Sequence, residues 1–244
     1  MVRTGVAAVR SVATYLAILA YIAVAAPVAL LIGGTFRSKR LIYMLGHGGV
    51  GLALGMAGIR YRVVGSRPPE STPVVFCSNH ESNVDPAVLF QALHPRLHIL
   101  YKAELHKFPL MGMVFDVGGF VPVDRQDRRQ SFDSLERGSA SLGAGNSFLI
   151  FPEGTRSRTG DLLPFKKGGF IMAIQAQVPI VPVAISGGRA AMRKGSAIVR
   201  PVRVSVRIGE PVPTTGLTLE DRDTVIARAR HEVQRLLAEG PTWN

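Results

Sequence analysis

Residues 74–86 read VVFCSNHESNVDP, and this stretch carries the strongest indication of the fold. Its first four residues are apolar and β-rich, which predicts a short buried strand. Polar residues follow at once, and we expect a helix beyond them. The point where a strand ends and a helix begins is a common place for the active site of an α/β protein.

Three other segments also have the composition of strands. Residues 148–151 read FLIF, and residues 180–185 form an apolar run broken only by Pro182, which suits a strand end or an edge strand. Residues 202–208 alternate apolar residues with arginine and serine. That period of two predicts a strand with one buried face and one basic face.

Helices are predicted between these strands, over residues 131–142 and 168–177. A last helix is expected after the start signal TLED at residues 218–221, and Gly240 and Pro241 predict its end. Strands that alternate with helices favour an α/β layer fold. The sequence contains no internal repeat, low-complexity run or internal linker.

The composition limits the class of protein. With 244 residues, the chain suits one α/β domain, alone or with an appendage. Apolar residues make up 47% and charged residues 19%, which excludes a mainly disordered chain. The formal net charge of +12 predicts an anionic partner: nucleic acid, an acidic membrane surface or a phosphorylated substrate. Cys77 is the single cysteine, so a disulfide framework is impossible and no oxidising compartment is needed.

Two apolar stretches near the N-terminus, residues 11–35 and residues 41–59, contain no charged residue. Each has about the 20 residues that span a bilayer as a helix. Basic residues lie before, between and after them, so the distribution of positive charge does not settle a topology. A secretory signal fits poorly, because the first stretch is too long and a second one follows.

Spanning helices and a helical pair embedded in one leaflet both fit these stretches, and both place the protein at a membrane. We favour the embedded pair, because Pro27 and the six glycines between residues 46 and 58 disfavour straight spanning helices. Core helices of a soluble protein fit less well, since the stretches have little polar face. We therefore predict a membrane-associated helical segment over residues 1–60 and a second domain over residues 61–244.

His80 and Asp85 form the pair that can carry chemistry at the end of the first strand. A histidine accepts a proton from a hydroxyl group near neutral pH, and a carboxylate can fix its tautomer and stabilise the imidazolium. Five residues apart on a regular helix, the two side chains would point about 140° away from each other. They meet only if the chain bends where the loop becomes a helix. A helix cap beside a surface histidine is the alternative interpretation.

Residues 151–158, FPEGTRSR, also follow a predicted strand. Glycine allows close approach of the backbone, hydroxyl groups donate hydrogen bonds, and arginine presents a planar fork that suits phosphate. A solvated turn with a Glu–Arg pair is the alternative. Residues 118–125 add a glycine pair that leads to a second arginine, and residues 178–183 add an apolar run without a chemical group.

The order of these four segments and the residues in them resemble those of the glycerolipid acyltransferase family, that of the lysophosphatidate acyltransferases. Its four blocks are Asn-His-x4-Asp, Gly-x5-Arg, Phe-Pro-Glu-Gly-Thr-Arg-Ser and an apolar block with an internal proline. All four stand here in order between Asn79 and Val183, although Pro122 replaces the bulky apolar residue of many members in the second block. The resemblance implies an α/β fold with a mixed central sheet flanked by helices, preceded by an apolar two-helix membrane motif.

In activity, the resemblance implies transfer of a fatty acyl group to the free sn-2 hydroxyl of 1-acyl-sn-glycerol 3-phosphate (lysophosphatidic acid), giving phosphatidic acid. The donor would be acyl-CoA or acyl carrier protein, with His80 as general base and Asp85 as its orienter. The enzyme would work with membrane lipids at the cell membrane, with its active site on the cytoplasmic face. No metal, cofactor or nucleic acid is expected.

The same resemblance implies a phosphate-binding site for the acceptor. Arg125 and Arg156 would bind the phosphate, with Gly154 and Thr155 in the same cradle. Glu153 belongs to this site, and we expect it to organise the turn rather than to transfer a proton.

Other interpretations stay open. The same machinery can act on glycerol 3-phosphate or another lysolipid, and a basic nucleic-acid-binding protein is a distant alternative. Cys77 is expected to be a core thiol rather than a nucleophile. Ser82 is expected to cap or support the His–Asp pair. His94 and His98 are four residues apart, but Pro95 lies between them and no acidic or cysteine ligand accompanies them, so we do not expect a metal site.

Overall fold

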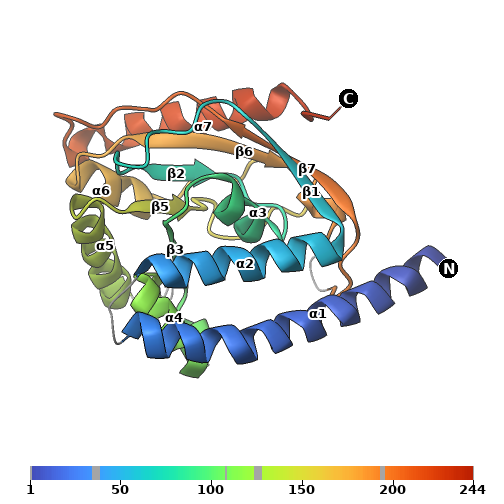
Figure 1. The fold of residues 1–244 in the computed structure, drawn as a ribbon. Coiled ribbons are helices and arrows are strands. Elements are labelled where there is room, and N and C mark those ends of the chain that lie inside the picture. Colours follow the sequence, from blue (N-terminus) through green and yellow to red (C-terminus); the bar gives the residue numbers. More distant parts are fainter. Residues whose placement is uncertain (1, 35–38, 108, 124–127, 193–195, 244) are drawn as a thin grey trace.

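The structure is a computed structural model that describes residues 2–34, 39–107, 109–123, 128–192 and 196–243. Within these residues, seven strands form one sheet in the order β1-β7-β6-β2-β5-β3-β4. The sheet is mixed, because β7 runs antiparallel to β6 whereas the other neighbouring pairs are parallel. Helices flank the sheet (Figure 1), as predicted for an α/β layer fold.

The strands have the bounds β1 (Ile59–Val64), β2 (Val75–Ser78), β3 (Leu97–Lys102), β4 (Val121–Val123), β5 (Ser147–Ile150), β6 (Ile180–Ser186) and β7 (Val202–Ile208). The α-helices are α1 (Val2–Val28), α2 (Lys39–Ala57), α3 (Asp85–Ala92), α4 (Pro109–Gly118), α5 (Arg128–Gly143), α6 (Gly168–Gln175) and α7 (Arg222–Ala238). Shorter helical segments are the π-helical η1 (Ala29–Gly34) and the 3₁₀ turns η2 (Ala103–Lys107), η3 (Gly188–Ala190) and η4 (Leu219–Asp221).

Most predicted elements are confirmed within a few residues. The alternating segment 202–208 is β7, and the two helices predicted over 131–142 and 168–177 are α5 and α6. The start signal before the last helix forms a capping box, in which Thr218 accepts a hydrogen bond from the backbone of Glu220 and its own N–H donates to Asp221. The turn η4 comes first, and α7 continues from it.

Pro182 is the exception, because the expectation of an edge position is wrong. It lies in β6, which has β2 on one side and β7 on the other. Pro182 is the register partner of Cys77 in β2, but the antiparallel ladder with β7 begins one residue later, at Val183. The proline therefore stands just beyond the end of the β7 ladder, where only its carbonyl is used, by the N–H of Gly209.

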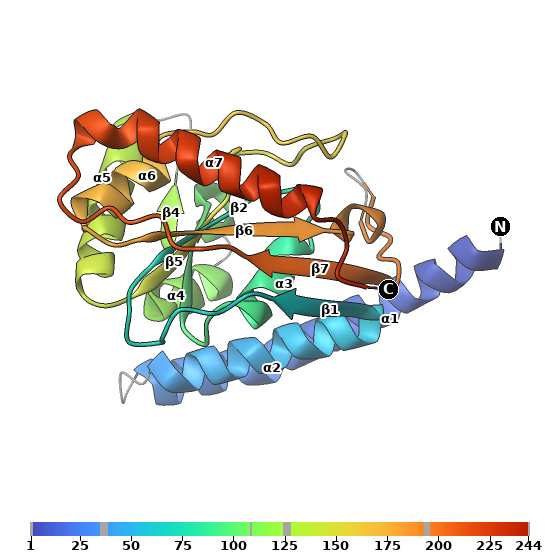
Figure 2. The same ribbon diagram turned by 90° about the horizontal axis from the view of Figure 1, so that it is seen from above.

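Two clusters of buried residues cover the two faces of the sheet. One cluster joins the sheet to α2 and α3, and the other joins it to α5, α6 and α7. Figure 2 shows α7 lying beside β6, with which it is in contact. The carboxyl end of the interior strand β2 lies at one end of the sheet, between the two helical layers. Neither layer covers it.

The two apolar N-terminal stretches form α1 and α2, which pack against each other, with α2 between α1 and the body (Figure 1). Of the described residues, only the segment Thr4–Ile32 is long and apolar enough to cross a membrane, judged by length and composition. Its exposed large apolar side chains are Val6, Val9, Val12, Tyr15, Leu16, Leu19, Ile22, Val24, Leu31 and Ile32. The second stretch differs, because α2 buries Ile42, Tyr43, Leu54 and Ala57 against its neighbours.

Candidate active site

The side chains of His80 and Asp85 meet at the carboxyl end of β2. The strand ends at Ser78, and α3 begins at Asp85. The chain between them bends, so that Nδ1 of His80 lies 2.9 Å from Oδ2 of Asp85. The contact that needed a bend at this junction therefore forms, at the kind of sheet edge where α/β proteins place their active sites.

Asp85 is held by the backbone of the same turn. Its side chain is fully buried, and Oδ2 also accepts hydrogen bonds from the N–H groups of Glu81 and Ser82, both at 2.7 Å. Oδ1 has no hydrogen-bond partner among the described residues. Gly188 covers it so closely that a Cβ on this glycine would lie 2.5 Å from Oδ1. The carboxylate thus has one orientation, and its charge faces His80.

The imidazole of His80 is supported on one ring face. Phe151 stacks on it with the ring centroids 4.2 Å apart. Since Nδ1 faces a carboxylate, Nδ1 carries the proton and Nε2 is left with a free electron pair. His80 keeps 16% of its side-chain surface exposed, so the site remains open to a substrate.

Glu153 ties the turn at residues 152–163 to His80. Its Oε1 accepts the backbone N–H of His80 at 2.7 Å, and its Oε2 accepts that of Leu163 at 2.9 Å. Burial raises the pKa of Glu153, and the nearby charge of Asp85 adds to the rise, whereas the two N–H donors oppose it. Both carboxylate oxygens of Glu153 accept backbone hydrogen bonds, which fits a residue that organises the turn. The negative charge of Glu153 would repel a phosphate.

One contact in this region had no role in the sequence interpretation, and a second bears on the support that was expected from Ser82. The amide of Asn79 pairs with the backbone of Ile185, donating at 2.9 Å and accepting at 2.8 Å, so the side chain extends the pairing of β2 with β6. Ser82 supports the turn mainly through its backbone, while its hydroxyl lies 3.4 Å from the carbonyl of Met192. Asn79 belongs to the first sequence block, which could have indicated a role for it. Its partner Ile185 lies 106 residues away, so the contact could not be predicted.

The predicted phosphate cradle is partly described. Gly154 has a φ of +68°, and a Cβ there would lie 2.9 Å from Nζ of Lys166, so a lysine also borders this turn. Nη1 of Arg156 is buried with no hydrogen-bond partner among the described residues. An unpaired guanidinium N–H in a buried position is costly unless an anion occupies it. The predicted Arg125 lies outside the described residues.

Three residues that invite other chemistry have structural contacts. Cys77 is fully buried in β2, and burial raises the pKa of its thiol, which supports the expected core position. Nε2 of His94 lies 3.4 Å from the carbonyl of Glu70, whereas Nδ1 of His98 lies 3.3 Å from the hydroxyl of Tyr43. The two histidines therefore have separate partners.

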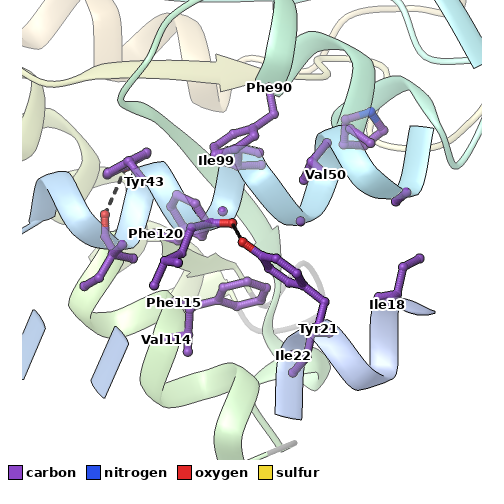
Figure 3. A pocket seen from close by; sticks show the side chains of 18 residues that line it. Ile18, Tyr21, Ile22, Tyr43, Val50, Phe90, Ile99, Val114, Phe115 and Phe120 are labelled. Atoms are coloured by element: carbon purple, nitrogen blue, oxygen red, sulfur yellow. Dashed lines mark hydrogen bonds between the residues drawn. The ribbon is translucent and has the colours of Figure 1, made fainter. Parts of the chain in front are cut away.

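An apolar cavity of about 480 Å³ lies between α1, α2, α4 and the start of α3 (Figure 3). Aromatic and aliphatic side chains line it, including Tyr21, Phe90, Phe115 and Phe120. Pro86, the residue after Asp85, also lines it, so the cavity reaches the first turn of the helix that carries this aspartate. A second apolar cavity of about 370 Å³ adjoins the first and shares seven lining residues with it, among them Tyr21 and Phe115.

Comparison with known proteins agrees with the fold. The family profile described as Acyltransferase matches residues 60–186, more than half of the chain. The chain belongs to this acyltransferase family, as its four sequence blocks predicted.

The relatives are more specific in name. A 1-acyl-sn-glycerol-3-phosphate acyltransferase from Limnanthes douglasii is 33% identical over 199 residues, which cover 81% of this chain and 70% of the relative. The human alpha form is 34% identical over 184 residues, covering 75% of this chain and 65% of the relative. The crystal structure of the 1-acyl-sn-glycerophosphate (LPA) acyltransferase PlsC from Thermotoga maritima matches with a TM-score of 0.82 at 23% identity, over 99% of this chain and 100% of that one. The mixed α/β fold is therefore that of PlsC.

Proposed function

We propose that this protein transfers a fatty acyl group from the thioester of acyl-CoA or acyl carrier protein to the sn-2 hydroxyl of 1-acyl-sn-glycerol 3-phosphate, giving phosphatidic acid. The contact between His80 and Asp85, 2.9 Å long at the open edge of the sheet, carries this proposal. The names of the relatives supply the acceptor.

In the proposed reaction, Nε2 of His80 takes the proton of the acceptor hydroxyl while Asp85 stabilises the imidazolium. The hydroxyl oxygen attacks the thioester carbonyl carbon, the new C–O bond forms and the C–S bond breaks. The thiolate leaves and takes up the proton from His80. Since a thiolate is a good leaving group, no covalent acyl-enzyme is needed, and neither is a metal or a cofactor.

The acceptor phosphate would lie on the turn that Glu153 fixes to His80. The Nη1 of Arg156, which has no partner in the described part of the chain, can donate to a phosphate oxygen, and Lys166 beside Gly154 adds a second positive charge. Arg125 is proposed for the same site on the ground of the sequence block alone. Because one hydrogen bond joins Glu153 to the backbone of His80, the position of the phosphate and that of the general base are coupled.

The apolar parts of the substrates need apolar surroundings. The cavity shown in Figure 3 reaches from Pro86 to α1, and we assign it to an acyl chain. The exposed apolar side chains of α1 would enter the membrane, on its cytoplasmic face, where the acceptor and the product reside. The net charge of +12 would attract anionic lipid and the anionic donor rather than nucleic acid.

An acyl-transfer assay with palmitoyl- and oleoyl-CoA tests the proposal, with lysophosphatidate, glycerol 3-phosphate and a neutral lysolipid as acceptors. We expect transfer to lysophosphatidate, and a loss of at least about 10²-fold in turnover for His80→Ala. His231→Ala, which removes an exposed histidine of α7, is the matched control. Preference for glycerol 3-phosphate would reassign the acceptor, and full activity of His80→Ala would end the proposed mechanism.

A further inference from the structure

A pocket apart from the active site opens at the corner where α1, α2, β1 and β7 meet. Its volume is about 540 Å³, and three arginines line it, Arg10 from α1, Arg60 from β1 and Arg203 from β7. We call it the three-arginine pocket. Its lining contains no acidic residue, and none of the three arginines forms an ion pair within the part of the chain that the structure describes.

Two of these arginines are direct neighbours in the sheet. Arg60 and Arg203 are register partners in the parallel pair of β1 and β7. Side chains in such positions leave the sheet on the same face, and like charges placed opposite each other are destabilising. Ile59 and Val204, their neighbours along the strands, belong to the core beneath α2 and α3, so the arginines leave from the other face. An anion bound between the two guanidinium groups would remove the repulsion.

Local structure makes room for these guanidinium groups. Gly58 has a φ of +73°, and a Cβ there would lie 2.9 Å from Nη1 of Arg10, so this glycine leaves the space that the side chain uses. The guanidinium of Arg203 lies over the ring of Trp243, 5.3 Å from its centroid. A cation–π contact of this kind limits the motion of the charged group.

The three-arginine pocket and His80 lie at the same edge of the sheet. Since β6 is parallel to β2 and antiparallel to β7, the strands β7 and β1 begin where β2 and β6 end (Figures 1 and 2). Gly187, directly after β6, packs against the backbone carbonyl of Arg203. Two strand spacings separate β2 from β7 and three separate it from β1, which is about 10 to 14 Å.

We propose that the three-arginine pocket binds the phosphate groups at the nucleotide end of acyl-CoA, while the thioester at the other end of the donor reaches His80. This inference rests on the proposed function. The flexible arm of CoA that separates its thioester from its phosphates is long enough to cross two or three strand spacings. Arg10 comes from the apolar helix α1, but the two arginines of the sheet, Arg60 and Arg203, leave from the face opposite the apolar helices, which favours a donor that arrives from water over a lipid headgroup.

The test compares two donors that carry the same thioester, oleoyl-CoA and oleoyl-N-acetylcysteamine, which lacks the nucleotide. We expect the double variant R60A/R203A to lose about tenfold in its preference for oleoyl-CoA, through a higher KM for that donor. Arg62→Ala is the matched control, because Arg62 also lies over Trp243, at 4.9 Å, but does not line the pocket. Thermal unfolding establishes that the variants are folded.

Other outcomes would overturn the inference. Equal rises in KM for both thioesters would show a general defect, and weaker binding to phosphatidylglycerol vesicles with an unchanged donor preference would assign the pocket to lipid. Calorimetric titration with adenosine 3′,5′-bisphosphate tests the pocket without catalysis, and R60A/R203A should bind it about tenfold more weakly than wild type. If wild type binds this nucleotide but transfers no acyl group to any acceptor, the proposed function fails and the anion site stands. If wild type is active but does not bind it, only the inference about the pocket fails.

Discussion

The turn around His80 and the helix α1 meet opposite requirements. At the turn, polar groups are buried and paired, since Oδ2 of Asp85 accepts three hydrogen bonds and both oxygens of Glu153 accept backbone N–H groups. On α1 the apolar side chains face outward, with Leu16 and Leu19 62% and 63% exposed. The difference teaches that the body of the protein positions the chemical groups, whereas α1 leaves large apolar side chains exposed outside the body.

The largest effect is expected from Asp85→Asn, which removes a charge from the polar turn around His80. The amide has the shape to stay in place, and its oxygen would keep the three hydrogen bonds of Oδ2, but the negative charge that stabilises the imidazolium of His80 is lost. We expect kcat/KM to fall by about 10² to 10⁴ in initial-rate measurements. Binding to vesicles should persist, because α1 is untouched.

Asp223→Asn, an exposed position on α7, provides the matched control for this loss. If Asp85→Asn keeps an activity within threefold of wild type, the charge of the aspartate does not stabilise the imidazolium of His80.

The apolar side of the comparison is tested by the double variant L16D/L19D. Burial of one leucine contributes about 1.5 to 3 kcal/mol, so losing two should weaken partition into anionic vesicles by at least about 10²-fold. The rate with an acceptor presented in vesicles should fall more than the rate with the same acceptor in detergent. Vesicle flotation measures the partition, with Leu219→Asp as an exposed control away from α1. Equal partition of wild type and L16D/L19D would contradict a membrane role of α1.

His98 of β3 joins the sheet to α2, the helix that lies between α1 and the body, because its Nδ1 lies 3.3 Å from the hydroxyl of Tyr43 in α2. Burial, helped by the charge of Lys39, lowers the pKa of His98 from 6.5 to about 4. The unfolded chain therefore binds the proton first as the pH falls, and stability present above about pH 6.5 is lost progressively down to about pH 4.

Between pH 7 and pH 5 we expect this histidine to lower the free energy of unfolding by about 2 kcal/mol. Urea unfolding of wild type and His98→Gln at both pH values measures the difference, since glutamine does not titrate. Parallel losses in the two proteins would mean that His98 does not weaken the contact between α2 and the sheet.

The smallest effect is expected from Arg156→Ala. This variant tests how the arginine differs from the two paired carboxylates of the same polar region. The buried Nη1 of Arg156 lacks a protein partner among the described residues, unlike the oxygens of Asp85 and Glu153 that face the turn. Removal should raise the KM for lysophosphatidate about tenfold, with a smaller change in kcat. Arg158→Ala, an exposed arginine two residues on, is the control. An effect confined to the KM of the acyl donor would reassign Arg156.

Local patterns predicted the elements where one period was clear. The alternation over 202–208 and the capping signal at Thr218 depend on nearby residues only, and both are confirmed. Pro182 was misplaced because its surroundings depend on the order of strands, and the ladder with β7 happens to start at Val183. The short strands β3 and β4 were not separately predicted, since they carry little periodicity of their own. β1 was also missed, although Ile59, Tyr61 and Val63 alternate with Arg60 and Arg62.

The candidate site divides in the same way. His80 and Asp85 lie five residues apart, so a single bend of the chain brings their side chains together. Their spacing in the sequence already indicated that such a bend is required. Glu153 is 73 residues from His80, and Asn79 is 106 residues from Ile185. These contacts exist only because β2 lies between β5 and β6 in the sheet, which brings the segments after these strands to one edge.

By itself, the sequence determined the family, the α/β alternation, the chemical pair and the apolar N-terminus, because motifs and periodicity are properties of neighbouring residues. Tertiary structure alone decided that Glu153 anchors the backbone of His80, that Gly188 covers Asp85, and that Arg10, Arg60 and Arg203 share one pocket. The physical reason is that each of these contacts joins residues from strands or helices distant in the chain, and the mixed strand order brings their ends together.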